Sequence, residues 1–240
     1  MRIHRMVSCL LCLLAATPAL GAPTGLNTIP TTDLVPMRSW VGQMQNGNTG
    51  LLHGPLFYNT PDLIYQSQFA LANRVEAGCD LLPGPDLDQR TVALNGKLSF
   101  LDEDVVRPNA AFGILNIANH LAPTYYLTFS KTLNYVEQQR VRFQAHHRRN
   151  RKLLGRRIHA GLMLTGGGVL EPFVGTDIQL NDSSVFQADW IQGAGNAASF
   201  GFVYILPDQK TVVNPAILFS NDTKRFDGFF LNISRQFTLF

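Results

Sequence analysis

Cysteine, long apolar runs and helical periodicity are all scarce in this sequence, and each absence excludes a class of protein. The chain has 3 cysteines in 240 residues, and two of them, Cys9 and Cys12, lie in an amino-terminal stretch that we expect to be removed. Cys79 would then stand alone, which excludes an intramolecular disulfide and a metal site built on several thiolates. The remainder has no run of about 18 apolar residues, so no transmembrane helix is predicted.

Residues 1–21 have the features of a secretory signal peptide. Arg2 and Arg5 precede a short apolar run, and small residues follow it, which predicts cleavage after Gly21 or Ala22. The apolar run is shorter than the ~20 residues that a membrane-spanning helix needs. We therefore divide the chain into a signal peptide (1–21), an extended lead-in (22–37) and a β-domain (38–240).

Apolar residues recur at every second position through most of the β-domain, between clusters of Gly, Pro, Asn and Asp. Many short strands of this kind indicate a sandwich or a barrel. Bacterial transmembrane barrels use an even number of strands, so we expect about twelve (range about 10–14) and one mistaken segment. We expect the mistake at 211–220, because Pro215 lacks the N–H that a central strand uses. The candidate segments are 38–46, 62–70, 74–82, 91–101, 110–118, 124–133, 138–145, 157–165, 171–180, 184–192, 198–206, 211–220 and 226–239.

The clearest hairpin turns at three consecutive glycines and alternates small apolar residues with Arg, His, Glu, Asp and Gln. Pairing about this turn places His159 opposite Gly175 and diagonal to Asp177, with Arg157 within ion-pair reach of Asp177. A soluble sheet turns its polar face to water, whereas a transmembrane barrel turns it to the lumen and its apolar face to lipid. The alternation alone does not choose between them.

A second hairpin repeats the pattern with a predicted three-residue turn at 71–73. This turn places Phe69 opposite Val75, and Gln68 beside Glu76 on the polar face. If the sheet closes, the polar faces of both hairpins line the lumen. The lumen residues that we predict are Arg74, Glu76, Asp80, Arg157, His159, Glu171 and Asp177.

Aromatic residues gather near the ends of the expected strands, as they do in the girdles of barrels at lipid interfaces. We therefore predict an all-β fold, an antiparallel up-and-down transmembrane β-barrel, in the bacterial outer membrane. The girdle candidates are Trp40, Tyr65, Tyr125, Tyr126, Tyr135, Trp190, Tyr204 and Phe237.

Ten basic and histidine residues lie between Arg140 and Arg157 with no Asp or Glu among them, which leaves the rest of the mature chain net negative. Such a block is typical of a solvated loop or an interaction surface. Counting strands places 146–156 with the long connections 47–61 and 83–89 on the outer surface, opposite the turns 71–73 and 166–168. There Arg side chains would bind lipopolysaccharide or acidic polysaccharide; export makes nucleic acid an improbable partner. The anion-binding residues that we predict are Arg148, Arg149, Arg151, Lys152 and Arg156.

The stretch Gly-Leu-Asn-Thr-Ile-Pro-Thr-Thr-Asp-Leu-Val-Pro at 25–36 resembles the start of outer-membrane barrel proteins associated with bacterial exopolysaccharide secretion. It departs from their pattern at Thr32, where Ala is usual, and at Ile29, which separates Thr28 from Pro30. The resemblance implies an outer-membrane location and a link to polysaccharide export. The final Phe240 is similar to the signal that such barrels present to their assembly machinery, although its parity is opposite to the apolar series before it.

The sequence does not predict an enzyme. Of the histidines in the mature chain, only His159 falls firmly on a polar strand face, where a lumen residue held by a carboxylate is a better interpretation than a catalytic base. There is no Gly-x-Ser-x-Gly elbow, His-Glu-x-x-His helix, phosphate loop or Cys/His ligand spacing. We therefore expect no catalytic residue, no metal and no cofactor.

Two functions from different classes fit these patterns. The first is an outer-membrane barrel with a polar lumen, acting as a narrow pore or an envelope scaffold, in contact with outer-membrane lipids. The second is a secreted or periplasmic β-sandwich that binds anionic glycans through the basic loop 146–157. Membrane fractionation separates them, because only the barrel stays with the outer membrane.

Overall fold

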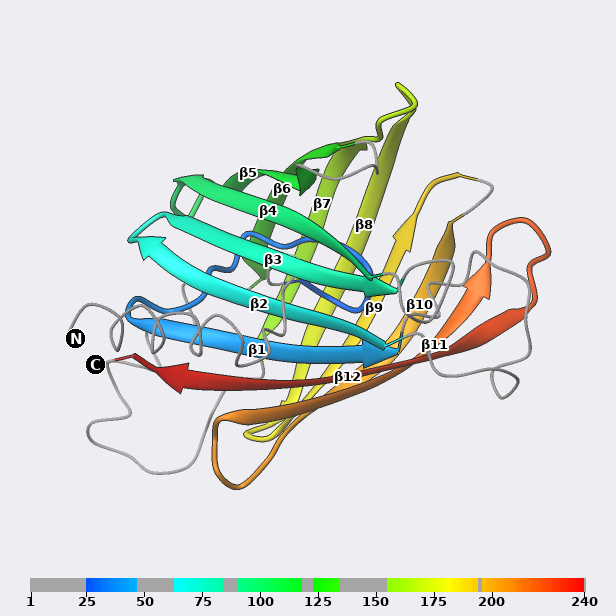
Figure 1. Ribbon diagram of the computed structural model, residues 1–240. Coiled ribbons are helices and arrows are strands. Elements are labelled where there is room, and N and C mark those ends of the chain that lie inside the picture. The colour runs from blue at the N-terminus through cyan, green and yellow to red at the C-terminus, as the bar shows by residue number, and fades with distance from the viewer. Residues whose placement is uncertain are drawn as a thin grey trace, which may run out of the picture.

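The computed structural model describes residues 25–46, 63–83, 90–117, 123–133, 155–193 and 196–239, and these form a closed antiparallel barrel of twelve strands (Figure 1). Each strand pairs with its neighbours in the chain, and β1 pairs with β12 to close the ring. None of the described residues forms a helix that could span a membrane. The strands are β1 Ser39–Asn46, β2 Leu63–Ala72, β3 Val75–Pro83, β4 Arg90–Leu101, β5 Asn109–Ile117, β6 Thr124–Leu133, β7 Arg156–Leu164, β8 Leu170–Asn181, β9 Ser184–Ile191, β10 Ala197–Ile205, β11 Thr211–Ser220 and β12 Phe226–Thr238.

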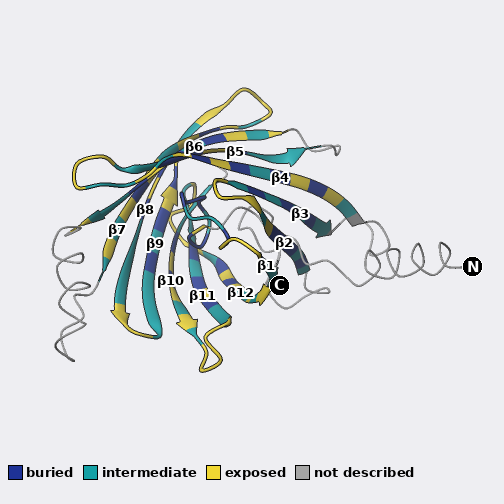
Figure 2. Ribbon diagram, turned by 90° about the vertical axis from the view of Figure 1, so that its left-hand side faces the viewer, coloured by how far each residue is buried: buried dark blue, intermediate teal, exposed yellow. Residues whose placement is uncertain are grey.

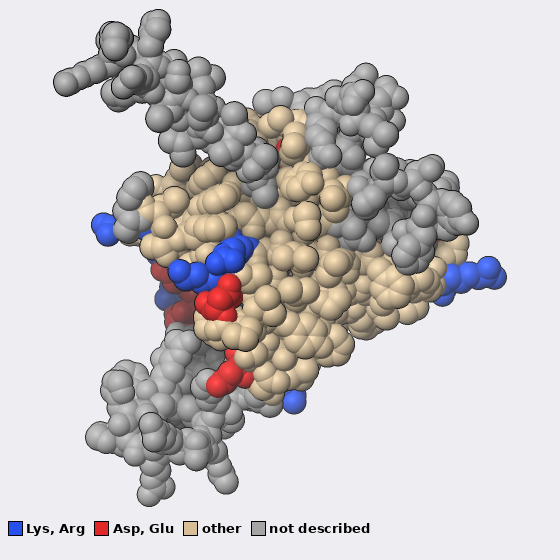
Figure 3. Space-filling model, turned by 60° about the horizontal axis from the view of Figure 1, so that its bottom comes forward, with Lys and Arg blue, Asp and Glu red and all other residues tan. Residues whose placement is uncertain are grey.

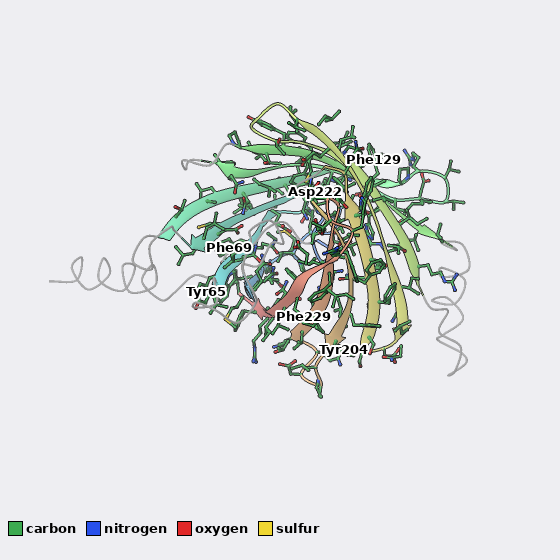
Figure 4. The ribbon with its side chains drawn as sticks, turned by 90° about the vertical axis from the view of Figure 1, so that its right-hand side faces the viewer. Tyr65, Phe69, Phe129, Tyr204, Asp222 and Phe229 are labelled. Carbon is green, nitrogen blue, oxygen red and sulfur yellow. The ribbon has the colours of Figure 1, made fainter. Side chains whose placement is uncertain are left out.

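The period-two alternation of the sequence separates the two faces of this wall. Side chains at alternate positions point outward and are largely apolar, and Phe129, Tyr204 and Phe229 lie on this outer side (Figure 4). The positions between them point inward and are mostly polar and buried. Closure leaves no second sheet to cover the apolar face, so the β-sandwich alternative is wrong. Outward apolar side chains that remain exposed include Leu94, Leu98, Phe112, Leu162, Val174, Phe200 and Leu231.

On the face drawn in Figure 3, charged side chains gather on the left and at the right-hand margin, and a broad uncharged area lies between them. Aromatic side chains mark both margins of this area. Trp40 stacks on Phe237 with 4.6 Å between ring centroids at one end of the barrel, and Tyr125 and Trp190 lie exposed at the other. Tyr126 contradicts the girdle prediction, because it points inward and is 1 % exposed. A ring of apolar surface between aromatic margins is the exterior that a lipid bilayer requires.

Arginine substitutions on this outer face should be costly in proportion to depth. Val174→Arg, in the middle of β8, is expected to lower the free energy of unfolding in lipid by about 2–4 kcal/mol, and Leu180→Arg, near the end of the same strand, by about 0–1 kcal/mol. Both side chains are 44 % exposed in the isolated protein. Urea unfolding of protein refolded into vesicles measures the difference. Equal losses for the two variants would show that this face does not meet a bilayer.

The strand prediction for 211–220 was right and the doubt about it was wrong. This segment is β11, and Pro215 lies opposite Leu231 of β12. On the other side, the ladder between β10 and β11 runs from Gly201↔Ala216 to Tyr204↔Val213 without a pair at Pro215. The missing N–H therefore falls where the ladder is interrupted. Candidate 138–145 lies outside the described residues, but β6 pairs directly with β7, so no strand is inserted between them.

The predicted registers were confirmed for one hairpin and wrong for the other. His159 pairs with Gly175 and Arg157 with Asp177, as the glycine turn implied. In the second hairpin, β2 ends at Ala72 and β3 begins at Val75, so the turn has two residues and a bulge follows Ala70. Phe69 therefore pairs with Ala77, and Gln68 with Gly78 rather than Glu76. The faces are unchanged because the register differs by two residues.

Because no strand lies between β6 and β7, where we predicted 138–145, the connections after β6 lie at the opposite end of the barrel from the one that we predicted. We call the end that holds Ser39 and Thr238 the terminus end, and the opposite end the far end. The chain leaves β6 and re-enters β7 at the terminus end. The prediction that the basic connection shares an end with the long connections 47–62 and 84–89 was therefore wrong. Turn 166–168, predicted at the opposite end, lies with these two connections at the far end. Terminus-end connections are 73–74, 102–108, 134–155, 182–183 and 206–210.

Two aspartates stabilise turns at the terminus end. Backbone N–H groups of Arg107 and Val106 and the Arg107 guanidinium lower the pKa of Asp104 to about 2. The Thr211 hydroxyl and the N–H groups of Lys210 and Thr211 do the same for Asp208. Both turns therefore keep their hydrogen bonds down to strongly acidic pH.

Candidate functional site

The part of the lead-in that the structure describes does not lie outside the barrel but runs through its lumen. We call residues 25–36 the plug segment; it lies inside the ring of strands, continuous with the start of β1 (Figures 1 and 2). A tight turn opens it, in which Leu26 N donates to Ile29 O at 3.0 Å and Gly25 bridges Pro30. Most of its side chains are buried, including those of Ile29, Thr31 and Thr32, each at most 2 % exposed. The interior of the barrel is therefore built around this segment.

An apolar cluster holds the turn of the plug segment. Leu26 and Ile29 pack with four inward side chains of the wall: Tyr126, Met163, Phe173 and Ile191. These four side chains are apolar although the inner face is mostly polar, because they pack in one cluster with the apolar side chains of Leu26 and Ile29. Gly175 of β8 makes room for the turn, because a Cβ there would lie 2.6 Å from Leu26 Cδ1 and 2.7 Å from Ile29 Cδ1.

Wall carboxylates accept hydrogen bonds from the plug segment. Thr28 donates its N–H to Asp189 Oδ2 at 3.0 Å and its hydroxyl to Asp189 Oδ1 at 2.5 Å. Ser199 also donates to Asp189, at 2.6 Å, and itself accepts from Asn27 at 2.9 Å. Nearer the terminus end, Val35 N donates to Glu76 Oε2 at 2.8 Å. Backbone donors of the plug segment thus meet buried acceptors on β3 and β9.

Two basic side chains of the wall donate hydrogen bonds to oxygen atoms of the plug segment. Lys97 of β4, whose side chain is fully buried, donates to the carbonyl oxygens of Thr31 and Asp33 and lies 3.7 Å from Glu76. Arg157 of β7 binds the Asp33 carboxylate with both terminal nitrogens, each at 2.8 Å. Such bidentate pairs are among the stronger hydrogen bonds in proteins. We call the Arg157–Asp33 pair the latch.

A chain of hydrogen bonds behind the latch joins three strands to the plug segment. Ser130 Oγ lies 2.8 Å from His159 Nδ1, and His159 Nε2 lies 3.1 Å from Asp177 Oδ2. Asp177 also lies 3.6 Å from Arg157. A consistent set of protons has Thr32 N–H donating to Ser130, Ser130 O–H to His159, and His159 to the carboxylate.

Serine, histidine and aspartate in this order resemble a hydrolytic triad, but the geometry opposes that role. Ser130 is 1 % exposed and His159 is 0 % exposed. Thr32 covers the Ser130 hydroxyl, so a substrate carbonyl has no approach to it. The trio instead orients Asp177 toward Arg157 and supports the latch. No group of three or more potential metal-ligating side chains occurs among the described residues.

The structure brings most of the predicted lumen residues inside. Arg157, His159 and Asp177 form the latch network, and Glu76 and Asp80 face inward from β3. Glu171 occupies an inward position at the far end of β8. Arg74 was predicted wrongly: it has inward parity but lies in the two-residue turn, where it is exposed and pairs with Asp102.

Several site residues were missed by sequence reasoning. Lys97, Ser130, Asp189 and Ser199 lie on polar faces that alternation identifies, but nothing marked them as contacts of a segment so distant in sequence. Of the predicted anion-binding residues, Arg156 is exposed at the first position of β7, with parity opposite to the lumen. Arg148, Arg149, Arg151 and Lys152 lie outside the described residues.

Comparison with known proteins adds little to this geometry. The chain matches no protein-family model, and no curated protein matches its sequence. Among solved structures it is similar to the KdgM porin in complex with disordered oligogalacturonate, with 8% identity, a TM-score of 0.47, and coverage of 83% of this chain and 96% of that one. The outer membrane channel DcaP of Acinetobacter baumannii follows at 10% identity, with a TM-score of 0.27 and coverage of 83% and 72%. The fold assignment rests on the strand pairing itself.

Proposed function

We propose that this chain is an outer-membrane barrel that works as a pore, and that its own plug segment is the gate. The apolar outer face between aromatic margins supports the membrane location. The polar inner face supports a passage. The lead-in resembles the start of exopolysaccharide-associated barrels, which supports envelope polysaccharide as a cargo of the open state.

One observation carries the gating proposal: the plug segment binds the wall mainly through groups that could equally bind water. Asp33, Thr28 and Val35 contact Arg157, Asp189 and Glu76, and each of these wall groups is polar or charged. Release of the segment would expose these polar groups to water, together with the smaller apolar cluster around Leu26 and Ile29. A purely structural core would more commonly be sealed by apolar contacts throughout.

Asp33→Asn tests the gate. The asparagine keeps the shape of the side chain but removes the charge that binds Arg157, and hydrogen bonds to charged groups contribute about 1.5–3 kcal/mol. Because Asp33 is half-exposed, we expect the lower part of this range, a rise of about tenfold in open probability in planar bilayers. Asp222→Asn, at an exposed turn of the far end, is the matched control and should leave conductance unchanged.

A second candidate function is an envelope scaffold that never opens, and the apolar anchoring of Leu26 and Ile29 favours it. The same recordings separate the two. A scaffold predicts no steps of conductance in the wild type or in Asp33→Asn, although both refold. Conductance steps in the wild type whose open times are longer in Asp33→Asn support the gated pore.

Binding of envelope anions by Arg148, Arg149, Arg151 and Lys152 is a separate proposal. The connection that carries them leaves and re-enters the wall at the terminus end. With periplasmic termini this end faces the periplasm, so its partners would be periplasmic polyanions. Replacing the four with Ser should then abolish salt-sensitive polyanion binding. An unchanged affinity and salt slope would contradict it.

A further inference from the structure

Charged side chains are distributed unevenly along the lumen, and this unevenness affects which solutes the pore proposed above can pass. In the terminus half, each inward base lies beside an acid: Arg157 with Asp177 and Asp33, and Lys97 with Glu76. These pairs leave little uncompensated charge on that half of the wall.

The far half is different. Its inward positions carry three carboxylates, those of Asp80, Glu171 and Asp189, from β3, β8 and β9. At the other inward strand positions of this half that the structure describes, there is no Lys or Arg. We call Asp80, Glu171 and Asp189 the far-half carboxylates. The lumen is therefore acidic on this side, although the chain as a whole has a formal net charge of +3.

Asp80 is the clearest sign that this half of the wall can attract a cation. It is 7 % exposed, it faces inward, and its Oδ1 atom has no hydrogen-bond partner. Its neighbours on β2 and β4 are the neutral side chains Gln66 and Asn95. A buried carboxylate oxygen without a donor is costly unless a proton, a water molecule or a cation reaches it.

Asp189 depends on the plug segment for its donors. Two of its hydrogen bonds come from Thr28 and one from the wall residue Ser199. When the plug segment leaves, Asp189 loses the two bonds from Thr28 and faces water as an ion. Opening thus exposes a further carboxylate to a lumen half that has no base to balance it among its described strand positions.

We propose that the far half of the lumen selects cations, and that the open pore passes cations and uncharged solutes in preference to polyanions. Rings of Asp and Glu select cations in other channels by the same electrostatics. This inference rests on the proposed pore, and it narrows the proposed cargo: a neutral or amine-bearing glycan fits the lumen, and a polyuronate does not.

The reversal potential of Asp33→Asn in a tenfold KCl gradient tests the selectivity directly. We expect a potential of the sign that favours K⁺, and a shift toward zero when Asp80→Asn is added. Asp222→Asn, which removes an exposed carboxylate in the turn after β11 and not on a strand of the wall, should leave the potential unchanged. A preference for Cl⁻, or no effect of Asp80→Asn, overturns the inference.

A second measurement needs no conductance. Gln45 occupies an inward, half-buried position in the far half of β1. Gln45→Cys, in a Cys79→Ser background, should react about tenfold or more faster with a cationic methanethiosulfonate than with an anionic one, after correction for their intrinsic rates. Equal rates, or faster reaction of the anionic reagent, overturn the inference. Absence of conductance overturns only the pore, so the two failures are distinguishable.

Discussion

Gly175→Leu is expected to drive the plug segment out of the lumen and convert a mostly closed barrel into a mostly open one. A Cβ at this position would already lie 2.6 Å from Leu26 Cδ1, 2.7 Å from Ile29 Cδ1 and 3.0 Å from Asp189 Cβ. A leucine adds three more carbon atoms in the same direction. Overpacking of this kind costs about 1–3 kcal/mol, so the open probability in planar bilayers should rise about 5- to 150-fold.

The strands should survive this change. Gly175 pairs with His159 and Asp189 in regular ladders, and a side chain adopts this backbone without strain. Gly175→Ala is the matched control: its two closest contacts, Leu26 Cδ1 and Ile29 Cδ1, are the tips of flexible side chains, and Asp189 Cβ at 3.0 Å has to give way only slightly. The turn can therefore shift slightly, and the pore should stay closed. Adding Leu26→Ala to Gly175→Leu should restore part of the closure. A barrel that refolds with leucine at 175 and stays closed would contradict the gate.

Lys97→Met is expected to destabilise the barrel more than any other substitution that we propose. The Lys97 side chain is fully buried and that of Glu76 is 2 % exposed. Removing the ammonium leaves the Glu76 carboxylate buried without its cation and deprives Thr31 and Asp33 of a donor. Breaking a buried ion pair costs about 3–5 kcal/mol, to be measured by urea unfolding in lipid vesicles.

The double variant Lys97→Met/Glu76→Gln is the control for this prediction. It removes both charges and keeps an acceptor for Val35 N–H. Its loss of stability should be clearly smaller than that of Lys97→Met, because no uncompensated charge is left behind. Equal losses in the single and double variants would show that the ion pair contributes little beyond packing.

The wall of the barrel could be predicted because it depends on local periodicity. Alternation fixes which side chains face the same way, so the inward positions of Glu76, Asp80, Arg157 and Asp177 follow once the sheet closes. The glycine turn fixed one register completely. Where the turn is not marked by glycine, as between Ala72 and Val75, the register was wrong by two residues while the faces stayed right.

The site could not be predicted because its partner is distant in sequence. Asp33 and Arg157 are 124 residues apart, and no pattern in the lead-in indicates that it folds inward. One signal was present and unused: Tyr126, Met163 and Phe173 are apolar residues at inward parity. Apolar residues on the polar face of a barrel imply an apolar partner in the lumen, here Leu26 and Ile29.

The misplacement of the basic connection has a simple physical cause. Segment 138–145 alternates like a strand, and one extra strand reverses the end at which every later connection falls. The error therefore also moved the turn 166–168 to the wrong end. An extra predicted strand does not change which face of the sheet each side chain lies on, but it does change the end of the barrel at which each later connection lies.

Thiol accessibility at position 32 is the most direct test of the plugged lumen. Thr32 is 1 % exposed and its N–H donates to Ser130 in the wall. A single cysteine at Thr32, in a Cys79→Ser background refolded into vesicles, should not react with a membrane-impermeant maleimide. The same cysteine should react readily once Gly175→Leu is added. Rapid labelling without Gly175→Leu, in a barrel of native stability, would show that residues 25–36 do not occupy the lumen.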